Sequence, residues 1–267
     1  MTAGHSLNDD GRQALKRDRV PWAYRFAAGI LRPLLMVLTK RDWRGQEHIP
    51  ATGGFVVCAN HISHFDPLTF AHFMFDSGRP AYFLGKVSVF QVPFVGFILR
   101  KAGQVPVYRE TPQAADAMRA AVAAVNAGKP VAVYPEGTLT REPDIWPMRG
   151  KTGAARIALE TRCPVLPVAQ WGAQEVIPVH GHVRPHLFPR KTMHMRVGPP
   201  IDLSDLYGAP LTRELLLLAT ERIMDGIENE LEQIRGAKAP AERYDPVVHG
   251  QPSIGSFDAE DRRDRPA

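Results

Sequence analysis

The chain has 267 residues, 44% of them hydrophobic, which is enough apolar material for the core of one larger α/β domain without a second domain. Its net charge of +5 and sequence pI near 9.4 suit an anionic partner, whether a lipid surface, a phosphorylated substrate or a nucleic acid. Only two cysteines occur, Cys58 and Cys163, which argues against a disulfide framework and fits a reducing compartment.

The amino-terminal residues are polar and charged, with almost no apolar side chains, so we expect residues 1–19 to form a disordered arm. They contain no uninterrupted apolar core of the kind that a secretory signal needs, and we expect no such signal.

A mostly apolar segment begins at Val20 and runs to Thr39, interrupted by Arg25 and Arg32. A central arginine is costly inside a bilayer, so we do not expect a transmembrane helix. Lysines and arginines flank the segment on both sides, which is typical of a helix lying in a membrane interface. We therefore assign residues 20–42 to an amphipathic, membrane-associated helix. The alternative is an amphipathic helix that packs on its own domain.

The stretch from Phe55 to Pro67 is the centre of the prediction. Its apolar run, Phe55 to Ala59, predicts a strand buried on both faces, and polar residues follow at the carboxyl end, where α/β sheets usually bind ligands. Asp66 followed by Pro67 is typical of an N-cap and a first helical residue, which leaves His61 in the preceding turn. Asp66 could then hold one imidazole nitrogen while the other takes a proton from a substrate hydroxyl. The alternative is a capped helix start with a solvated histidine.

Asn60-His61 with Asp66 matches the signature N-H-x-x-x-x-D, and on these residues the chain resembles the glycerolipid acyltransferases, the lysophosphatidic acid acyltransferase group in particular. The resemblance implies that His61 and Asp66 are catalytic and that Asn60 belongs to the substrate site. It also implies membrane association, which that family shares.

A second block of the resemblance is the predicted strand from Gly103 to Arg109. In the family, an arginine after such a strand binds the acceptor's phosphate, and the planar guanidinium suits that task because it can donate two hydrogen bonds to phosphate oxygens. Without the resemblance, Arg109 would be interpreted as a surface charge at a strand end.

The third block is Tyr134-Pro135-Glu136-Gly137-Thr138, which follows the family's [F/Y]-P-E-G-T segment in the same order. The resemblance assigns Glu136, Gly137 and Thr138 to substrate binding, with Glu136 orienting an acceptor hydroxyl or a nearby cation. Arg141 is assigned with them, although two inserted residues separate it from the block. A fourth block is the apolar strand Cys163 to Ala169, whose prolines suggest a place near a sheet edge or strand end.

Two lysines complete the predicted substrate site. Lys86 closes the strand predicted from Ala81, and Lys151 begins a helix predicted to run to Thr161, whose amino end favours anions. The sequence around Lys151 lacks the spacing of a nucleotide-binding loop, so we reject that interpretation.

Four histidines lie close together in the sequence: His180, His182, His186 and His194. They do not predict a metal site, because no set of carboxylates or cysteines completes one. The first three lie among Gly, Pro and Arg, in what we interpret as a solvated basic loop, while His194 falls in a strand predicted from Thr192 to Val197, and we expect no metal.

Strands alternate with helical segments along the chain, which predicts a single α/β domain with a mixed or mostly parallel central sheet flanked by helices. We assign residues 43–235 to this domain, with a long amphipathic helix from Leu211 to Ile234 near its end. The apolar segment Val87 to Lys101 is expected to be a buried helix, or alternatively a wall for an acyl chain or a second membrane contact. Residues 236–267 are rich in Pro, Asp and Arg and are expected to form a disordered tail.

The predicted function is transfer of a fatty acyl group from acyl-CoA or acyl carrier protein, as co-substrate, to the hydroxyl of a lysophospholipid, with 1-acylglycerol-3-phosphate as the expected acceptor. No cofactor is expected. Backbone N–H groups near the His61 turn are the expected donors to the oxyanion. The predicted place is the cytoplasmic side of the cell membrane, as a peripheral or monotopic protein on anionic lipid.

Four alternatives differ in substrate or class. The acceptor could be glycerol-3-phosphate or another lyso-glycerolipid or glycolipid, and the chain could be a non-catalytic lipid-binding protein of the same fold. A thioesterase or lipase is disfavoured because no G-x-S-x-G segment occurs, and nucleic-acid binding because the basic residues are scattered.

Overall fold

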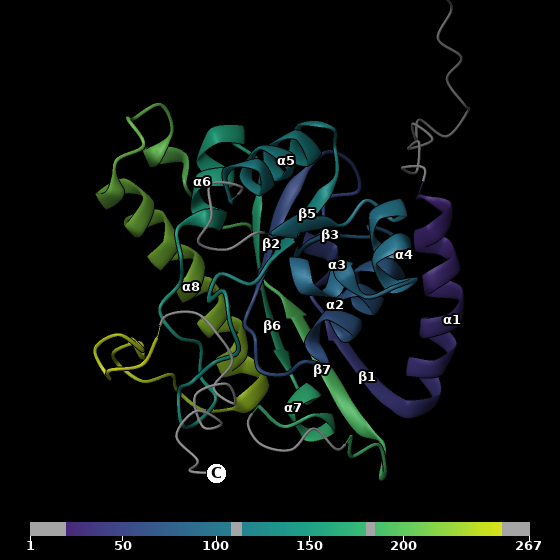
Figure 1. Ribbon diagram of the computed structural model, residues 1–267. Coiled ribbons are helices and arrows are strands. Elements are labelled where there is room, and N and C mark those ends of the chain that lie inside the picture. Colours follow the sequence, from purple (N-terminus) through teal and green to yellow (C-terminus); the bar gives the residue numbers. More distant parts are fainter. Residues whose placement is uncertain (1–19, 108–113, 180–184, 253–267) are drawn as a thin grey trace, which may run out of the picture.

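The computed structural model describes residues 20–107, 114–179 and 185–252 (Figure 1). Its centre is one sheet in the order β1-β7-β6-β2-β5-β3-β4. All neighbours run parallel except β6 and β7, which are antiparallel, so the prediction of a mostly parallel α/β sheet is confirmed. The strands are β1 (Thr39–Arg44), β2 (Phe55–Ala59), β3 (Tyr82–Lys86), β4 (Val105–Val107), β5 (Pro130–Val133), β6 (Val165–Trp171) and β7 (Lys191–Val197).

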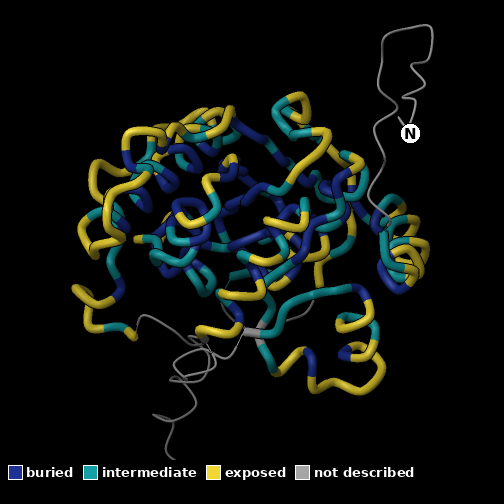
Figure 2. Tube along the Cα trace, turned by 90° about the horizontal axis from the view of Figure 1, so that it is seen from above, coloured by how far each residue is buried: buried dark blue, intermediate teal, exposed yellow. Residues whose placement is uncertain are grey.

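Helices lie on both faces of this sheet (Figure 1). They are α1 (Trp22–Leu38), α2 (Asp66–Asp76), α3 (Val87–Gln91), α4 (Val95–Lys101), α5 (Ala114–Asn126), α6 (Gly153–Thr161), α7 (Ala173–Val176) and α8 (Arg213–Arg235), with short 3-10 turns at Gln46–His48 and Ser204–Leu206. In Figure 2 the buried segments lie in the middle of the molecule and the exposed ones at its rim.

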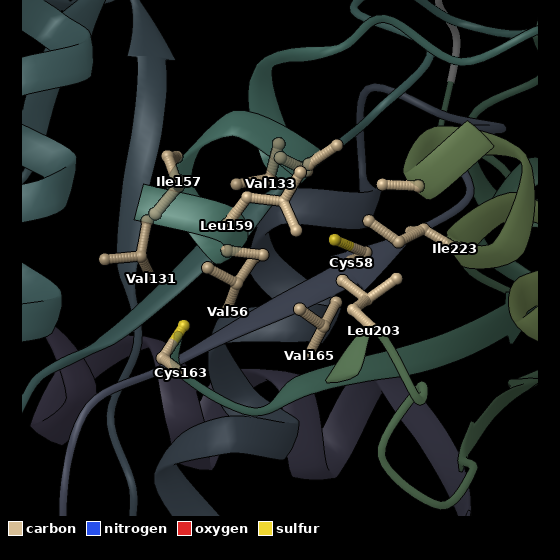
Figure 3. Packing of buried hydrophobic residues seen from close by; sticks show 14 of the residues in the cluster. Val56, Cys58, Val131, Val133, Ile157, Leu159, Cys163, Val165, Leu203 and Ile223 are labelled. Carbon is tan, nitrogen blue, oxygen red and sulfur yellow. The ribbon is translucent and has the colours of Figure 1, made fainter. Parts of the chain in front are cut away.

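The two faces of β2 explain why its sequence is apolar at every position. Val56 and Cys58 point into a cluster closed by α5, α6 and α8 (Figure 3). Phe55, Val57 and Ala59 point the other way, into a cluster closed by α2. All five side chains are buried, as predicted for a strand covered on both faces. Cys58 and Cys163 are both free and buried.

The predicted helix over residues 20–42 is shorter in the structure. Helix α1 ends at Leu38, and Thr39 begins β1, which pairs in parallel with β7. The Thr39 hydroxyl donates to the Leu35 carbonyl at 2.7 Å, so the last turn of α1 and the start of β1 are joined directly. Among the described residues, no helix has both the length and the apolarity that crossing a membrane requires.

The apolar segment from Val87 to Lys101 forms two short helices rather than one buried helix. The turn between α3 and α4 is exposed, and Phe94 in it has a φ of 63° and is 68% exposed. Helix α4 packs against α1 through Ile98 and Ala102. The surface of this segment therefore adjoins the surface of α1.

The predicted disordered tail is also corrected in part. Residues 236–252 follow α8 as an irregular and mostly exposed segment that returns to residues 148 and 149, where Met148 and Tyr244 form a parallel bridge. The rest of the predicted tail, the arm of residues 1–19, and His180 and His182 lie outside the described residues.

Pro167 differs from its predicted place at a sheet edge. It lies within β6, an interior strand, opposite Cys58 of β2. The antiparallel pairing of β6 with β7 begins one residue later, at Val168. Pro167 therefore lies just outside that pairing.

Candidate active site

The predicted catalytic pair, His61 and Asp66, follows the carboxyl end of β2, and Glu136, predicted to bind substrate, follows that of β5, the neighbour of β2 in the middle of the sheet. The turn after β2 carries His61, and the turn after β5 carries Glu136. Parallel strands bring their carboxyl ends to one edge, and this explains how residues 75 positions apart come into hydrogen-bonding contact.

His61 and Asp66 form the pair that the motif predicts. The Nδ1 atom of His61 lies 2.9 Å from Oδ2 of Asp66. The same oxygen accepts the backbone N–H groups of Ile62 at 2.6 Å and Ser63 at 2.8 Å. Asp66 is therefore not the N-cap of α2 but its first residue, and its carboxylate folds back to close the preceding turn.

The side chain of Asp66 is fully buried, and this burial affects the pKa of its carboxyl. Burial raises the pKa of its carboxyl, while the hydrogen bonds from His61, Ser63 and Ile62 act in the opposite direction because they favour the ionised form. A protonated His61 would place a positive charge beside this buried oxygen. The pair is thus suited to stabilise an imidazolium.

The imidazole of His61 is held by stacking as well as by hydrogen bonding. Its ring lies on Tyr134 with centroids 4.1 Å apart and planes 16° apart. The side chain keeps 16% exposure, while Asp66 has none. Because Asp66 binds Nδ1, Nε2 is the nitrogen left to meet a substrate.

Glu136 lies against the backbone of the histidine turn. Its Oε1 accepts the N–H of His61 at 2.8 Å, and its Oε2 accepts the N–H of Met148 at 2.9 Å. Burial raises the pKa of Glu136 to about 8, against the opposing effect of these two hydrogen bonds. The side chain is 1% exposed, so this placement does not support the predicted contact with an acceptor hydroxyl. It supports a role in holding His61.

The loop that follows Glu136 completes this hold. The N–H of Thr140 donates to the carbonyl of His61 at 2.8 Å, so the loop binds both backbone groups of the histidine. The Thr140 hydroxyl donates in turn to the Trp146 carbonyl at 2.6 Å. We call residues 134–149 the Glu136 loop.

Other predicted substrate residues lie on or beside this loop. Gly137 has a φ of 74°, and Lys151 packs so closely against it that an added Cβ would lie 3.1 Å from Cδ of the lysine. Thr138 is partly buried. Arg141 is 5% exposed, with its guanidinium bonded to the carbonyl of Pro252, so its placement does not support direct contact with substrate.

Asn60 has a structural place rather than a substrate-facing one. It is fully buried, its Oδ1 accepts the N–H of Gln170 at 2.8 Å, and its Nδ2 donates to the Gln170 carbonyl at 3.1 Å. The side chain of Gln170 donates back to the Asn60 carbonyl at 2.6 Å. This reciprocal pair fixes the end of β2 against β6, and the assignment of Asn60 to substrate binding is not supported by it.

Two predicted substrate residues remain, Lys86 and Arg109. Lys86 is the last residue of β3, paired in register with Val107 at the end of β4. Arg109 lies outside the described residues, two positions beyond β4.

The expected source of oxyanion donors is wrong for the first residues of the turn. The N–H groups of His61, Ile62 and Ser63 are already bonded to Glu136 and Asp66. The hydroxyl of Ser63 donates to the Ile177 carbonyl at 2.7 Å and is not poised as a nucleophile. Donors to an oxyanion must therefore come from elsewhere.

Sequence reasoning missed Gln170, Met148, the hydrogen bond from Thr140, and the stacking by Tyr134. Of these residues, only Tyr134 could have been singled out from the sequence, because it is the first residue of the third motif block. In the part of the chain that the structure describes, no group of three or more His, Cys, Asp or Glu side chains is arranged to hold a metal ion.

Comparison with known proteins agrees with this geometry. Residues 40–171 match the family model described as Acyltransferase, a match that includes β2, the histidine turn, the Glu136 loop and β6. The chain belongs to this family and is an acyltransferase.

Its similarity to individual proteins points to one group within the family. The chain is 28% identical over 214 residues to the 1-acyl-sn-glycerol-3-phosphate acyltransferase of Bacillus subtilis strain 168, covering 79% of this chain and 100% of that protein. It is 32% identical over 125 residues to the protein of the same name from Borreliella burgdorferi, covering 46% of this chain and 48% of that one.

A solved structure shares the fold. The crystal structure of PlsC, the 1-acyl-sn-glycerophosphate (LPA) acyltransferase of Thermotoga maritima, superimposes with a TM-score of 0.63 at 23% identity. The alignment covers 85% of this chain and 86% of that one, and at this identity it supports the fold alone.

Proposed function

We propose that the protein transfers a fatty acyl group from an acyl thioester, carried by coenzyme A or acyl carrier protein, to the hydroxyl of 1-acylglycerol-3-phosphate, giving phosphatidic acid for phospholipid synthesis. The observation that carries the proposal is the His61–Asp66 pair, 2.9 Å apart, with Nε2 of His61 as the nitrogen left for substrate. The names of the relatives support the choice of acceptor.

In the proposed reaction, Nε2 of His61 takes the hydroxyl proton as the acceptor oxygen attacks the thioester carbonyl. The new C–O bond forms, the C–S bond breaks, and the thiolate leaves with the proton that His61 returns. Asp66 stabilises the imidazolium in between. No acyl-enzyme is required, and the hydroxyl nearest in sequence, that of Ser63, is buried and already bonded to Ile177.

We also propose that the protein works on the cytoplasmic face of the cell membrane, as a peripheral or monotopic protein. Five exposed apolar side chains of α1 recur every three or four residues, which places them on one helix face: Trp22, Phe26, Ile30, Leu34 and Val37. The adjoining α3–α4 segment exposes Val89, Val92, Phe94, Val95 and Phe97. Exposed cations beside these surfaces (Arg25, Lys40, Arg100 and Lys101) suit anionic lipid.

The test measures thiol release from palmitoyl- and oleoyl-CoA by the detergent-solubilised full chain, with lysophosphatidic acid, glycerol-3-phosphate, lysophosphatidylcholine or no acceptor. We expect release that requires lysophosphatidic acid and falls by about 10²–10⁴-fold in His61→Ala. His194→Ala is a matched control, because His194 also pairs through Nδ1 with an aspartate at 2.9 Å, but in β7 and with Asp42 of β1.

Each other outcome identifies a different function. Retention of more than about a tenth of the turnover in His61→Ala would exclude His61 as the base. Release without an acceptor would indicate a thioesterase, and release with glycerol-3-phosphate alone would indicate a different acceptor. No release with either acyl-CoA would indicate another donor, another acceptor or a lipid-binding protein.

A further inference from the structure

The segment after α8 returns to the candidate active site. Residues 236–252, which we call the C-terminal strap, meet the end of the Glu136 loop at a parallel bridge between Tyr244 and Met148. The N–H of Arg149 donates to the Tyr244 carbonyl at 3.0 Å. The guanidinium of Arg149 pairs with Asp245 at 2.8 Å, so backbone and side chains both join the strap to the loop.

Arg243, next to Tyr244, anchors the strap to α8. Its guanidinium contacts three carboxylates at helical spacings of four and three residues, on one face of α8: Glu221, Asp225 and Glu228. The two bonds to Glu228 measure 2.7 and 2.8 Å. The Arg243 side chain is only 13% exposed, and a charge buried to that extent is strongly destabilised when its partners are removed.

The residue that the strap binds is also the residue that holds Glu136. Met148 forms the bridge to Tyr244, and its N–H donates to Oε2 of Glu136 at 2.9 Å. The other oxygen of Glu136 accepts the N–H of His61. A continuous series of contacts therefore runs from Arg243 through Met148 and Glu136 to the backbone of His61.

We propose that Arg243 is a positioning residue for acyl transfer: by fixing the C-terminal strap on α8, it holds Met148 against Glu136 and so holds His61 in the orientation in which it works as a base. This inference rests on the proposed function of His61. Met148 and Glu136 are each 1% exposed and the series reaches His61 at its backbone N–H, so the strap acts on the rate of the chemical step rather than on substrate affinity.

Kinetics of Arg243→Ala test the proposal. We expect kcat to fall by about 3- to 30-fold, the range seen for residues that act through others, with both KM values within about twofold of wild type. Arg243→Lys, which keeps a cation among the carboxylates, should recover much of the loss. The matched control is Arg196→Ala, because Arg196 pairs with Glu230 of the same helix at 2.6 Å but ties it to β7. It should leave kcat unchanged.

The pH profile separates positioning from general destabilisation. Weakening the hydrogen bond from Met148 removes an effect that lowers the pKa of Glu136, so the rise of kcat with pH should move to higher pH in Arg243→Ala and not in Arg196→Ala. An unchanged kcat and profile in folded Arg243→Ala, or an equal effect in Arg196→Ala, would overturn the proposal. If Arg243→Ala does not fold, Asp245→Ala replaces it, and there too an unchanged kcat overturns the proposal.

A readout without turnover distinguishes this proposal from the proposed function. In protein labelled with ¹⁵N-histidine, the backbone amide signal of His61 can be assigned by its loss in His61→Ala. We expect that signal to move in Arg243→Ala and to stay in place in Arg196→Ala. A wild-type protein without acyltransferase activity would refute the function, whereas an unmoved signal would refute the positioning role.

Discussion

Glu136 contacts His61 through the backbone and not through the imidazole. Its Oε1 accepts the His61 N–H at 2.8 Å, while Asp66 binds the ring nitrogen at 2.9 Å. Two buried carboxylates thus divide the positioning of one residue, since one fixes the main chain and the other fixes the ring. This division predicts different consequences for the two substitutions.

Asp66→Asn should nearly abolish turnover while leaving the fold intact. The amide keeps the size of the carboxylate but carries no charge to stabilise the imidazolium, and it can stabilise the wrong tautomer of His61. We expect kcat to fall by up to about 10⁴-fold, the loss that the same change causes in a serine protease triad. Steady-state kinetics with a far-ultraviolet circular dichroism spectrum would check this, and a kcat within tenfold of wild type would contradict it.

Glu136→Gln should lower kcat and change its dependence on pH. Glutamine has one acceptor oxygen where the carboxylate has two, so either His61 or Met148 loses its hydrogen-bond acceptor, which we expect to lower kcat by about tenfold or more. Because the ionised form accepts hydrogen bonds best and the pKa is about 8, wild-type kcat should keep rising with pH through 8. The variant should lose that part of the rise. Superimposable profiles from pH 6 to 9.5 would count against the role of Glu136.

The free energies of unfolding of the wild-type protein and of Glu136→Gln should also depend differently on pH. Folding raises the pKa of Glu136 from 4.5 to about 8, so the folded state binds the proton more tightly and its stabilising effect is lost as pH rises through that range. The free energy of unfolding of wild type minus that of Glu136→Gln should therefore decrease between pH 5 and 8, with a slope of at most about 1.4 kcal/mol per pH unit. Urea unfolding at several pH values measures this difference, and an increase would contradict the sign.

Asn60→Ala should destabilise the protein without changing substrate affinity. The substitution leaves the backbone N–H and carbonyl of Gln170 without their partner in a buried place, which costs about 1–3 kcal/mol for each unpaired group. We expect a lower melting temperature and unchanged KM values for donor and acceptor. Asn60→Asp keeps the acceptor for Gln170 N–H and serves as a graded control. A raised KM with unchanged stability would restore the substrate-binding assignment.

The exposed face of α1 should be required for binding to vesicles. Phe26 and Ile30 are 46% and 55% exposed, and replacing both with serine removes apolar area equivalent to about 10- to 100-fold in partitioning. Leu211→Ser with Leu218→Ser is the matched control, since these side chains are 37% and 45% exposed and lie just before and on α8, a helix on the opposite side of the molecule from α1 (Figure 1). Co-sedimentation with vesicles containing phosphatidylglycerol measures the effect. Equal loss in both pairs would argue against a specific surface.

The central turn could be predicted because its signals are local. A wholly apolar strand, a histidine just after it and an Asp-Pro pair five residues on determine where the turn lies and which groups can meet. The role of Asp66 as an acceptor for Ile62 and Ser63, rather than as the cap of α2, depends on a backbone conformation that the residue types leave open.

Contacts between distant segments could not be predicted in the same way. Asn60 and Gln170 are 110 positions apart, and neither residue type indicates which residue is its hydrogen-bond partner. The composition of the strap, rich in Pro, Asp and Arg, predicts disorder, because the contacts of Arg243 with three carboxylates of α8 depend on the fold and not on local composition. The sequence predicts a helix up to residue 42, whereas the pairing of β1 with β7 ends α1 at Leu38. That pairing involves the distant strand Lys191–Val197 and has no signal in the local sequence.

The junction between α1 and β1 has no linker. Leu38 ends the helix, Thr39 begins the strand, and Arg190 binds the carbonyls of Met36 and Thr39 across the junction. A helix joined in this way cannot swivel independently of the sheet. If α1 lies along a lipid surface, its orientation sets the tilt and height of the whole sheet, and the catalytic turn would sample only substrate within a thin layer. Turnover would then follow the mole fraction of acceptor in the surface rather than its bulk concentration.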